Sequence, residues 1–485
     1  MFRSIYMPEP KLEFGDGGQH IDPRAGLIDY GPLQPMVGDV IRVGVIGTGE
    51  TIAGFSKFMA RCQEGIAGKL TKEGKPHPRA NLFPPFPGLQ NRNPFRCGFS
   101  TDDTLQRMIP NGDIRKIAGI AKQNDAVGAA VELFADQTRI LLEGSSKPDV
   151  IVAALPIDLI AKIVNARAGV GGVDDGDDDR DPLNFRDMYK ARALLMHAPT
   201  QVVWPTLWDD HAKIPHKIRK TIRKVQDPAT RAWNMLNALF YKAGRAPWRL
   251  PIREGEYKTT FLGIGFYKDL GGRNLMTSTA QMFDERGRGL ILRGGKALHD
   301  KHDRHPYLER GDAYQLVVRS LEEYRAQHGH LPARLVIMKT SRFDNAEADG
   351  MMAAATDGGV SFCDLVWVSE SPHQVLMREG NYPALRGTAV ELGGDLMLYT
   401  RGSVPWYRTY PGARVPNPLM LRPHSCDSPI EQLGEEILGL TKMNWNSTQF
   451  DQALPIPIRA ARQVGKVLKH VSDAQIERSD YRFYI

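Results

Sequence analysis

Hydrophobic positions in the first half of the chain predict a domain of alternating strands and helices. Residues 41–54 have the pattern of a strand that leads through a glycine turn into a helix, and residues 149–155 form a short apolar run. A run of that length is typical of a strand buried on both faces, as in parallel sheets. Apolar side chains recur at helical spacing over 118–135, whereas 76–99 is rich in proline and asparagine and predicts irregular structure. The first half therefore predicts an α/β fold.

The same patterning predicts strands and helices in the rest of the chain. Residues 257–266 and 334–343 predict two strands, and 431–438 predict an amphipathic helix with an acidic face. Near the start, residues 5–14 alternate loosely between apolar and polar and predict one strand. The segment 22–32 that follows is rich in turn-forming residues.

Composition narrows the class of protein. A length of 485 residues predicts two or three domains. Lys and Arg total 63 against 56 Asp and Glu, and this net charge of +7 is compatible with a polyanionic partner. The four cysteines show no metal-binding or redox spacing, which favours a reducing compartment. No apolar run resembles a secretory signal or a membrane span, so we expect a soluble, cytoplasmic protein.

Three polar residues lie where separate elements could bring them together. Lys190 lies in a predicted helix, Gln201 lies where a strand begins, and Lys242 lies near the end of a second helix. Lysine supplies a point charge, and glutamine supplies a donor and an acceptor. Such a set could hold one small anion, although each residue alone is more typical of solvated surface.

The order of the surrounding motifs resembles a known family. The motifs are Phe-Arg-Asp-x-x-Lys-Ala at 185–191, Pro-Thr-Gln-Val-Val at 199–203 and Tyr-Lys-Ala-Gly-x-x-Pro-Trp at 241–248. Together they resemble the guide-binding MID domain of prokaryotic Argonautes. The resemblance implies that Lys190, Gln201 and Lys242 hold the 5′-phosphate of a guide strand, with Mg²⁺ as the accompanying ion.

Further residues are implied at the same phosphate. Arg186 stands where the family usually has Tyr or His, and an arginine plane can also stack on a base. Asn237 lies close to another lysine position of some relatives and could donate to the phosphate. In many Argonautes the terminal carboxylate folds back to this site, which implies a role for Ile485, together with Gln201, in holding the ion.

The second half resembles a PIWI domain, an RNase H-like fold. Slicing members of that family cluster carboxylates that hold two divalent ions against the scissile phosphate. The corresponding positions here are Gly265, Thr340 and Arg462. Glycine and threonine supply no negative charge, and arginine would repel the ions. The resemblance therefore implies an inactive slicer site with no catalytic residues.

The resemblance extends over nearly the whole chain. It implies an α/β protein in which a Rossmann-like MID domain at 41–250 is followed by an RNase H-like PIWI domain at 251–485. Residues 1–40 are expected to pack on the PIWI side. Because no room remains for separate N and PAZ domains before MID, the pattern is similar to a short prokaryotic Argonaute.

Such proteins are guided sensors, and the resemblance implies the same activity here. A 5′-phosphorylated guide, generally RNA, would pair with single-stranded target DNA while the protein reads duplex shape and backbone. The expected partner is a separately encoded APAZ-domain protein that carries a TIR or sirtuin-like NADase, or a nuclease. Target recognition would activate this effector in a heterodimer, or in a higher oligomer, during defence against plasmids or phage by abortive infection.

Two enzyme alternatives remain open. One is a guided nuclease with unusual metal ligands. The other is an NAD-dependent enzyme that uses the turn at Gly47 and Gly49, since 41–54 resembles a dinucleotide fingerprint. However, the third glycine position is Ile52, and no acidic residue follows at the expected spacing.

Three further segments could bind ions. The loop 171–181 is rich in glycine and aspartate but lacks the closing glutamate of a calcium loop. The segment 299–305 crowds three histidines and two aspartates and could hold a metal. Basic residues between 213 and 224 are typical either of a solvated helix face or of a groove that follows phosphates.

Overall fold

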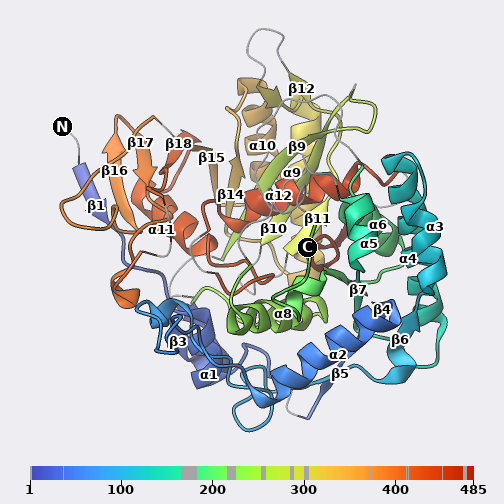
Figure 1. Cartoon of the computed structure of the whole chain (residues 1–485). Helices are drawn as coiled ribbons and strands as arrows, with labels where there is room; N and C mark the ends of the chain where they lie inside the picture. Colours follow the sequence, from blue (N-terminus) through green and yellow to red (C-terminus); the bar gives the residue numbers. More distant parts are fainter. Residues whose placement is uncertain are drawn as a thin grey trace. The chain divides into compact units, whose positions relative to one another are not determined.

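A computed structural model of the chain describes residues 3–35, 38–164, 183–215, 225–252, 258–272, 274–283, 289–299, 305–371, 373–410, 412, 414–449, 452–472 and 478–485. The chain divides into two units (Figure 1). Unit 1 contains residues 1–33, 248–444 and 448–481, and unit 2 contains residues 34–247, 445–447 and 482–485.

Unit 2 is built on a parallel sheet. Its strands are β4 (Val40–Gly47), β5 (Gly98–Ser100), β6 (Gln106–Met108), β7 (Val150–Ala154) and β8 (Thr200–Val203). The order is β5-β4-β7-β8, with β6 also paired to β4, and every pair is parallel. All five residues of β7 are buried, which explains the apolar run in the sequence.

Helices connect these strands. They are α2 (Gly49–Glu64), α3 (Asn111–Ala118), α4 (Gln123–Glu143), α5 (Ile157–Ile163), α6 (Phe185–Leu195) and α8 (Pro228–Lys242), with 3-10 turns η2 (Ala80–Leu82), η3 (Asp103–Leu105) and η4 (Pro205–Leu207). Side chains from α3, α4, α5 and α6 share one hydrophobic core with β7. Helix α8 has its own aromatic contacts, in which Trp233 packs edge-on against Phe86.

Unit 1 is built on a ten-stranded sheet in the order β1-β16-β17-β18-β15-β14-β9-β10-β11-β19. These strands are β1 (Arg3–Tyr6), β9 (Thr259–Lys268), β10 (Leu275–Phe283), β11 (Gly289–Leu292), β14 (Arg334–Lys339), β15 (Phe362–Glu370), β16 (Thr388–Leu392), β17 (Asp395–Leu398), β18 (Leu419–Ser425) and β19 (Arg478–Asp480). The pairs β9–β14 and β14–β15 are parallel. The other pairs along this order are antiparallel.

Helices and short elements complete unit 1. They are α1 (Pro23–Tyr30), α9 (Arg310–His328), α10 (Asn345–Asp357), α11 (Ile430–Leu440) and α12 (Ile456–Leu468), the strands β2 (Leu12–Glu13), β3 (Gln19–His20), β12 (Leu298–His299) and β13 (Pro306–Tyr307), and the turns η1 (Gly15–Gly17) and η5 (Pro405–Tyr407). The turn η6 (Tyr481–Phe483) lies where the chain passes into unit 2. Helices α9 and α10 share a core with β9, β14 and β15.

Helix α12 packs against β9 and β10. A Cβ atom on Gly263 of β9 would lie 2.3 Å from the main chain of Pro457, so this close approach requires glycine.

Most of the strongly patterned elements are confirmed. Strands occupy 150–154 of the predicted run 149–155, 259–266 of the run 257–266 and 334–339 of the run 334–343, and α11 covers 431–438. The expected strand and helix of 41–54 are β4 and α2.

One prediction about local structure is wrong, and a second is right over only part of its range. The region 5–14 is not one strand, because the chain leaves β1 after Tyr6 and pairs again only at Leu12. Pro8 and Pro10 lie in this interval and have no N–H for a ladder. The region 118–135 is not one helix either, since α3 ends at Ala118 and α4 begins at Gln123 after a break at Gly119.

Among the helices that the structure describes, none combines the length and apolar content that crossing a membrane requires.

Candidate phosphate-binding site

Helix α6 holds Lys190 in the interior of unit 2. The helix begins where Asn184 accepts a hydrogen bond from the main-chain N–H of Arg186 at 2.9 Å. Phe185 and Tyr189, one turn apart, pack in the hydrophobic core and fix the rotation of the helix. The next residue, Lys190, is therefore carried inward and is only 1% exposed.

A strand and a second helix supply the other two predicted residues. Gln201 lies in β8 opposite Val152 of the central strand β7. Asp227 caps the start of helix α8, and its carboxylate accepts a hydrogen bond from the N–H of Thr230 at 3.0 Å. The last residue of α8 is Lys242, and Gly244 follows in the left-handed region (φ 88°) that terminates helices.

The structure brings Lys190, Gln201 and Lys242 together. The Lys190 amine donates to the main-chain oxygen of Thr200 at 2.9 Å, and it also donates to the main-chain oxygen of Ile485. The Lys242 amine donates to Oε1 of Gln201, the residue after Thr200. Two amines and one amide from three elements thus meet at the start of β8, as the order of motifs predicts.

Arg186 adds a third cation at the edge of this group. Its guanidinium donates to the Asp187 carboxylate at 2.9 Å and to the main-chain oxygen of Tyr484 at 3.3 Å. The side chain remains 36% exposed, in contrast to the two buried lysines. Arg186 contacts Tyr484 and Lys190 contacts Ile485, so both side chains lie at the last residues of the chain, and Arg186 is the more accessible of the two.

Side-chain carboxylates compensate little of the charge of the site. Burial lowers the pKa of Lys190 well below its usual value, and repulsion from Lys242 and Arg186 lowers it further, against the opposing effect of Asp187. Burial followed by repulsion from Arg186 lowers the pKa of Lys242 in the same way. Among the described contacts, no side-chain carboxylate bonds either amine. An anion bound here would offset the cost of burying the two positive charges and would reduce the repulsion between the cations.

Asn237 is placed elsewhere. Five residues along a helix correspond to about 500°, so Asn237 lies on a different side of α8 from Lys242. Its amide donates to the main-chain oxygen of Trp445 at 2.6 Å. The described contacts do not join it to the amines of the site.

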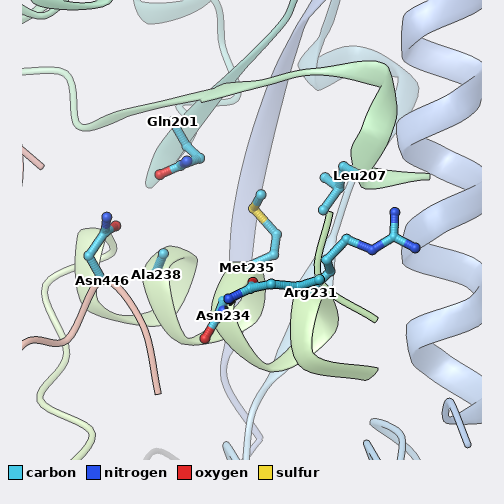
Figure 2. Close-up of a pocket in the computed structure, with 8 residues that line it drawn as sticks. Gln201, Leu207, Arg231, Asn234, Met235, Ala238 and Asn446 are labelled. Atoms are coloured by element: carbon cyan, nitrogen blue, oxygen red, sulfur yellow. Dashed lines mark hydrogen bonds between the residues drawn. The ribbon is translucent and has the colours of Figure 1, made fainter. Parts of the chain in front are cut away.

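A pocket of about 170 Å³ lies next to this site and shares Gln201 with it (Figure 2). We call it the amide pocket, and its lining consists of Gln201, Leu207, Gln226, Arg231, Asn234, Met235, Ala238 and Asn446. Apart from Gln201, sequence reasoning missed these residues. The spacing of 231, 234, 238 and 242 along one helix was the available signal, because such residues share a face.

The three positions that correspond to slicer ligands lie in unit 1. Ile264 of β9 and Lys339 of β14 form the last pair of this parallel ladder, and Gly265 and Thr340 are the residues that directly follow them. Arg462 lies on α12, which packs against β9. In the part of the chain that the structure describes, no three His, Cys, Asp or Glu side chains are grouped closely enough to hold a metal ion.

One buried carboxylate lies near the end of β14. Glu347 accepts a hydrogen bond from the Lys339 amine, and both side chains are fully buried. Glu347 also accepts from the main-chain N–H of Leu308 at 3.1 Å. This carboxylate is thus committed to an internal ion pair.

A neighbouring side chain fills the space at the turn of Gly47 and Gly49. A Cβ atom on Gly47 would lie 2.4 Å from Oγ1 of Thr51, which donates to the main-chain oxygen of Ala154 at 3.0 Å. Glu50 lies in the first turn of α2, where a negative charge disfavours a second anion. These features give no support to a pyrophosphate site here.

The remaining predicted ion sites lie largely outside the described residues. This applies to the whole of the glycine and aspartate loop at 171–181, to 216–224 of the basic run and to 300–304 of the histidine-rich segment.

Comparison with solved structures shows that the fold is that of Argonaute proteins. The chain is similar to Clostridium butyricum Argonaute bound to a guide DNA with a 5′ deoxycytidine and a 19-mer target DNA, with a TM-score of 0.66 and 15% sequence identity. It is also similar to Aa-Ago with externally bound siRNA (TM-score 0.59, 14% identity) and to A. aeolicus Argonaute (TM-score 0.53, 15% identity). The predicted fold class, a Rossmann-like MID domain followed by an RNase H-like PIWI domain, is confirmed.

The matches cover 100%, 99% and 98% of this chain, in the same order, but 55%, 56% and 54% of those proteins. The chain therefore spans about half of their length. No protein-family model matches the sequence, and no curated protein matches it.

Proposed function

We propose that the chain binds the 5′-phosphorylated end of a guide strand in unit 2 and uses that strand to recognise complementary nucleic acid. The observation that carries this proposal is the pair of buried amines, Lys190 and Lys242, which bond main-chain and amide oxygens rather than side-chain carboxylates. Buried charges are normally paired. A phosphate monoester carries close to two negative charges at neutral pH and would match this excess.

The chemistry of the site suits a terminal phosphate. Phosphate oxygens accept charge-assisted hydrogen bonds from lysine amines, and these are stronger than bonds to neutral oxygens. The bound phosphate would draw the two amines from Thr200, Ile485 and Gln201. Arg186, already near the surface, would add a planar guanidinium that can bond the phosphate or stack on the first base.

Mg²⁺ remains part of the proposal. Oxygen atoms are the ligands that Mg²⁺ takes, and it commonly binds beside substrate phosphates. Oε1 of Gln201 and the main-chain oxygen of Ile485 are such atoms, and each accepts a hydrogen bond from a lysine amine. A phosphate that attracts both amines would leave these two oxygens available to the ion.

We further propose that the chain acts as a short prokaryotic Argonaute without slicing activity. The likeness of the fold to an Argonaute structure bound to a guide and a target strand supports guided binding. The residues Gly265, Thr340 and Arg462 offer no carboxylate. In this proposal the guide is RNA, the target is single-stranded DNA, and a partner APAZ-domain protein carries the NADase or nuclease that acts in defence.

The phosphate site is tested by the double substitution Lys190→Ala with Lys242→Ala. Binding of a labelled single strand is measured with a 5′-phosphate and with a 5′-hydroxyl. Because each bond to a charged group contributes about 1.5–3 kcal/mol, the wild-type chain should prefer the phosphate by roughly a hundredfold or more. The double variant should bind both strands equally.

The matched control replaces two exposed lysines of the same unit, Lys57→Ala and Lys122→Ala, and removes the same charge. This control should retain the preference. Equal preference in wild type and in the Lys190/Lys242 variant would overturn the assignment. Circular dichroism of all variants establishes that the folded state is retained.

The absence of slicing is tested with the guide-loaded chain, a complementary DNA or RNA target and either Mg²⁺ or Mn²⁺. We expect the target to remain intact. Cleavage at a fixed position relative to the guide would instead support the guided nuclease alternative.

A further inference from the structure

The connection between α2 and β5 carries most of the net positive charge of the chain. We call residues 66–97, which follow α2 and lead to β5, the basic excursion (Figure 1). It contains six cationic side chains and one carboxylate, that of Glu73, whereas the excess of cations over the whole chain is seven. The six are Lys69, Lys72, Lys75, Arg79, Arg92 and Arg96. The proposed phosphate site uses none of them.

Aromatic contacts fix the base of the basic excursion to α8. Phe86 packs edge-on against Trp233 with ring centroids 5.0 Å apart, and Nε1 of Trp233 donates to the main-chain oxygen of Pro85 at 3.1 Å. Phe86 and Ile66 also exchange two main-chain hydrogen bonds of 2.8 Å. The side chains of Phe86, Ile66 and Trp233 are buried. The base of the excursion therefore belongs to the folded core of unit 2.

The outer part of the basic excursion is a tight turn that presents lysines to solvent. The main-chain N–H of Thr71 donates to the oxygen of Lys75 at 2.8 Å, and that of Gly74 donates to the oxygen of Thr71 at 3.1 Å. Gly74 has a φ of 76°, in the left-handed region that glycine adopts without strain. Lys72 and Lys75 are both exposed on this turn. The backbone bonds hold the two amines close to each other, although like charges repel.

Carboxylates of the protein compensate little of this charge. Among the described ion pairs, no carboxylate joins five of the six cations, which are Lys69, Lys72, Lys75, Arg92 and Arg96. Exposed cations on the helices of the same unit differ, since Lys116 pairs with Asp113 at 2.9 Å and Arg192 pairs with Glu132 at 2.6 Å. The excursion is therefore suited to an anionic partner.

The polar surroundings of these cations favour a nucleic-acid backbone over a protein. Protein interfaces are centred on apolar side chains, and to the exposed large hydrophobic side chains that the structure describes the excursion contributes Leu70. Its other exposed side chains include the amides of Asn81, Gln90 and Asn91. Lysine, arginine and amide side chains are the groups that bond phosphates along a strand, and such binding needs no particular base sequence.

The place of the excursion relative to the phosphate site indicates which strand it meets. Its anchor, Trp233, lies about 14 Å from Lys242 along α8, given a rise of about 1.5 Å per residue. Because paired strands are antiparallel, a target that is longer than its guide continues past the 5′ end of the guide at the phosphate site. We propose that the basic excursion binds the backbone of this continuing target strand, an inference that rests on the proposed function of the phosphate site.

The test measures the affinity of the guide-loaded full chain for three DNA targets that are all complementary to the guide. One target ends opposite the first guide nucleotide, one carries about ten further unpaired nucleotides at its 3′ end, and one carries them at its 5′ end. About ten nucleotides at roughly 3.4 Å each exceed the distance along α8.

The 3′ extension should strengthen binding by about fivefold or more at low salt, whereas the 5′ extension should change it by less than about twofold. Each phosphate contact on a single strand contributes about 0.7 to the slope of log K against log salt. With about three such contacts, the slope should be steeper by about 2 for the 3′-extended target than for the unextended one.

The test variant combines Lys72→Gln, Lys75→Gln and Arg92→Gln, which leaves the aromatic base of the excursion intact. Its gain in affinity from the 3′ extension should fall below about twofold, and its two salt slopes should agree to within about 0.7. The matched control combines Lys57→Gln, Lys122→Gln and Lys147→Gln. These lysines are exposed elsewhere in unit 2, so the control removes the same charge and should keep the gain.

Equal affinities for the 3′-extended and unextended targets in the wild-type chain would overturn the proposal. So would a gain confined to the 5′ extension. A gain that the test variant retains in full would also overturn it and would leave the excess charge to a protein or lipid partner. In each case a retained preference for a 5′-phosphorylated guide would leave the proposed function standing, whereas absence of that preference in the wild type would remove both proposals.

Discussion

Buried lysines occur in both units, but their surroundings differ. In unit 1, Lys339 bonds the carboxylate of Glu347, and Lys442 bonds that of Glu9 at 2.9 Å. In unit 2, Lys190 and Lys242 bond only main-chain and amide oxygens among the described residues. All four amines are nearly inaccessible to solvent.

The pKa values reflect this contrast. Burial lowers the pKa of Lys339 and of Lys442, and in each case the neighbouring carboxylate acts in the opposite direction. Burial also lowers the pKa of Lys190 and of Lys242, and there the cationic neighbours add to the effect. We infer that the lysines of unit 1, which bond side-chain carboxylates, serve the fold. The lysines of unit 2 have no side-chain carboxylate partner among the described residues and are therefore suited to bind an anion.

The largest expected effect is on stability and concerns unit 1. Glu347→Ala leaves the buried Lys339 amine without its carboxylate, which should lower the free energy of unfolding by about 3–5 kcal/mol. Chemical denaturation measures the change. The double variant Lys339→Met with Glu347→Leu should recover most of it, because an apolar pair can replace a buried ion pair. A loss below about 1 kcal/mol in the single variant would contradict the distinction between the two kinds of lysine.

Substitution of a buried lysine in unit 2 should lower the affinity for a 5′-phosphorylated strand rather than the stability of the protein. Lys242→Met removes a desolvated cation that Arg186 repels, so the free energy of unfolding should stay constant or rise by about 1 kcal/mol. Affinity for a 5′-phosphorylated strand should fall roughly 10- to 150-fold, the equivalent of about 1.5–3 kcal/mol. Denaturation and binding are measured on the same preparation. A destabilisation as large as that of Glu347→Ala would identify Lys242 as structural.

Guide binding should depend on pH. Phosphate favours the charged form of both amines and raises their pKa values from the lowered values of the free protein, so binding takes up protons. Affinity should therefore fall as the pH rises from about 7 towards the usual lysine pKa of about 10.4. Over the same range the 5′-hydroxyl strand should show a smaller change. An affinity that is constant across this range would show that the amines do not change protonation on binding.

The stability of the free protein should change in the opposite direction and increase as the pH rises. A lysine with a lowered pKa in the folded state binds fewer protons than in the unfolded state, so its contribution to stability improves as the pH rises through that interval. Lys242→Met should flatten this part of the stability profile.

The smallest expected effect is that of Mg²⁺. Removing the ion with a chelator should weaken binding of the 5′-phosphorylated strand by less than about tenfold, because the two amines and Arg186 supply most of the positive charge. The 5′-hydroxyl strand serves as the control and should not respond. A complete loss of binding would make the ion, rather than the lysines, the main anion ligand.

Strongly patterned elements could be predicted from the sequence, and their boundaries could not. The apolar run of β7 and the strand, turn and helix of β4 and α2 are local signals that tertiary packing leaves intact. Helix α3 ends before Gly119, although apolar residues continue at helical spacing through the break to α4. Apolar periodicity indicates which face of a helix is buried, but it does not indicate where the helical hydrogen bonds stop. The prolines between β1 and β2 were a sequence signal for the interruption there.

The sequence by itself placed Lys190 and Lys242 on predicted helices and Gln201 at the start of a predicted strand. That the three residues meet at one site was implied by the resemblance of the ordered motifs to a known family. Only the tertiary structure decided that both amines are buried with no side-chain carboxylate partner among the described residues, that Asn237 turns to Trp445, and that an amide pocket adjoins Gln201. These properties depend on residues far apart in the chain, such as Ile485 and Asn446, which folding brings to the site. Burial and charge compensation are properties of such neighbours, and no local pattern records them.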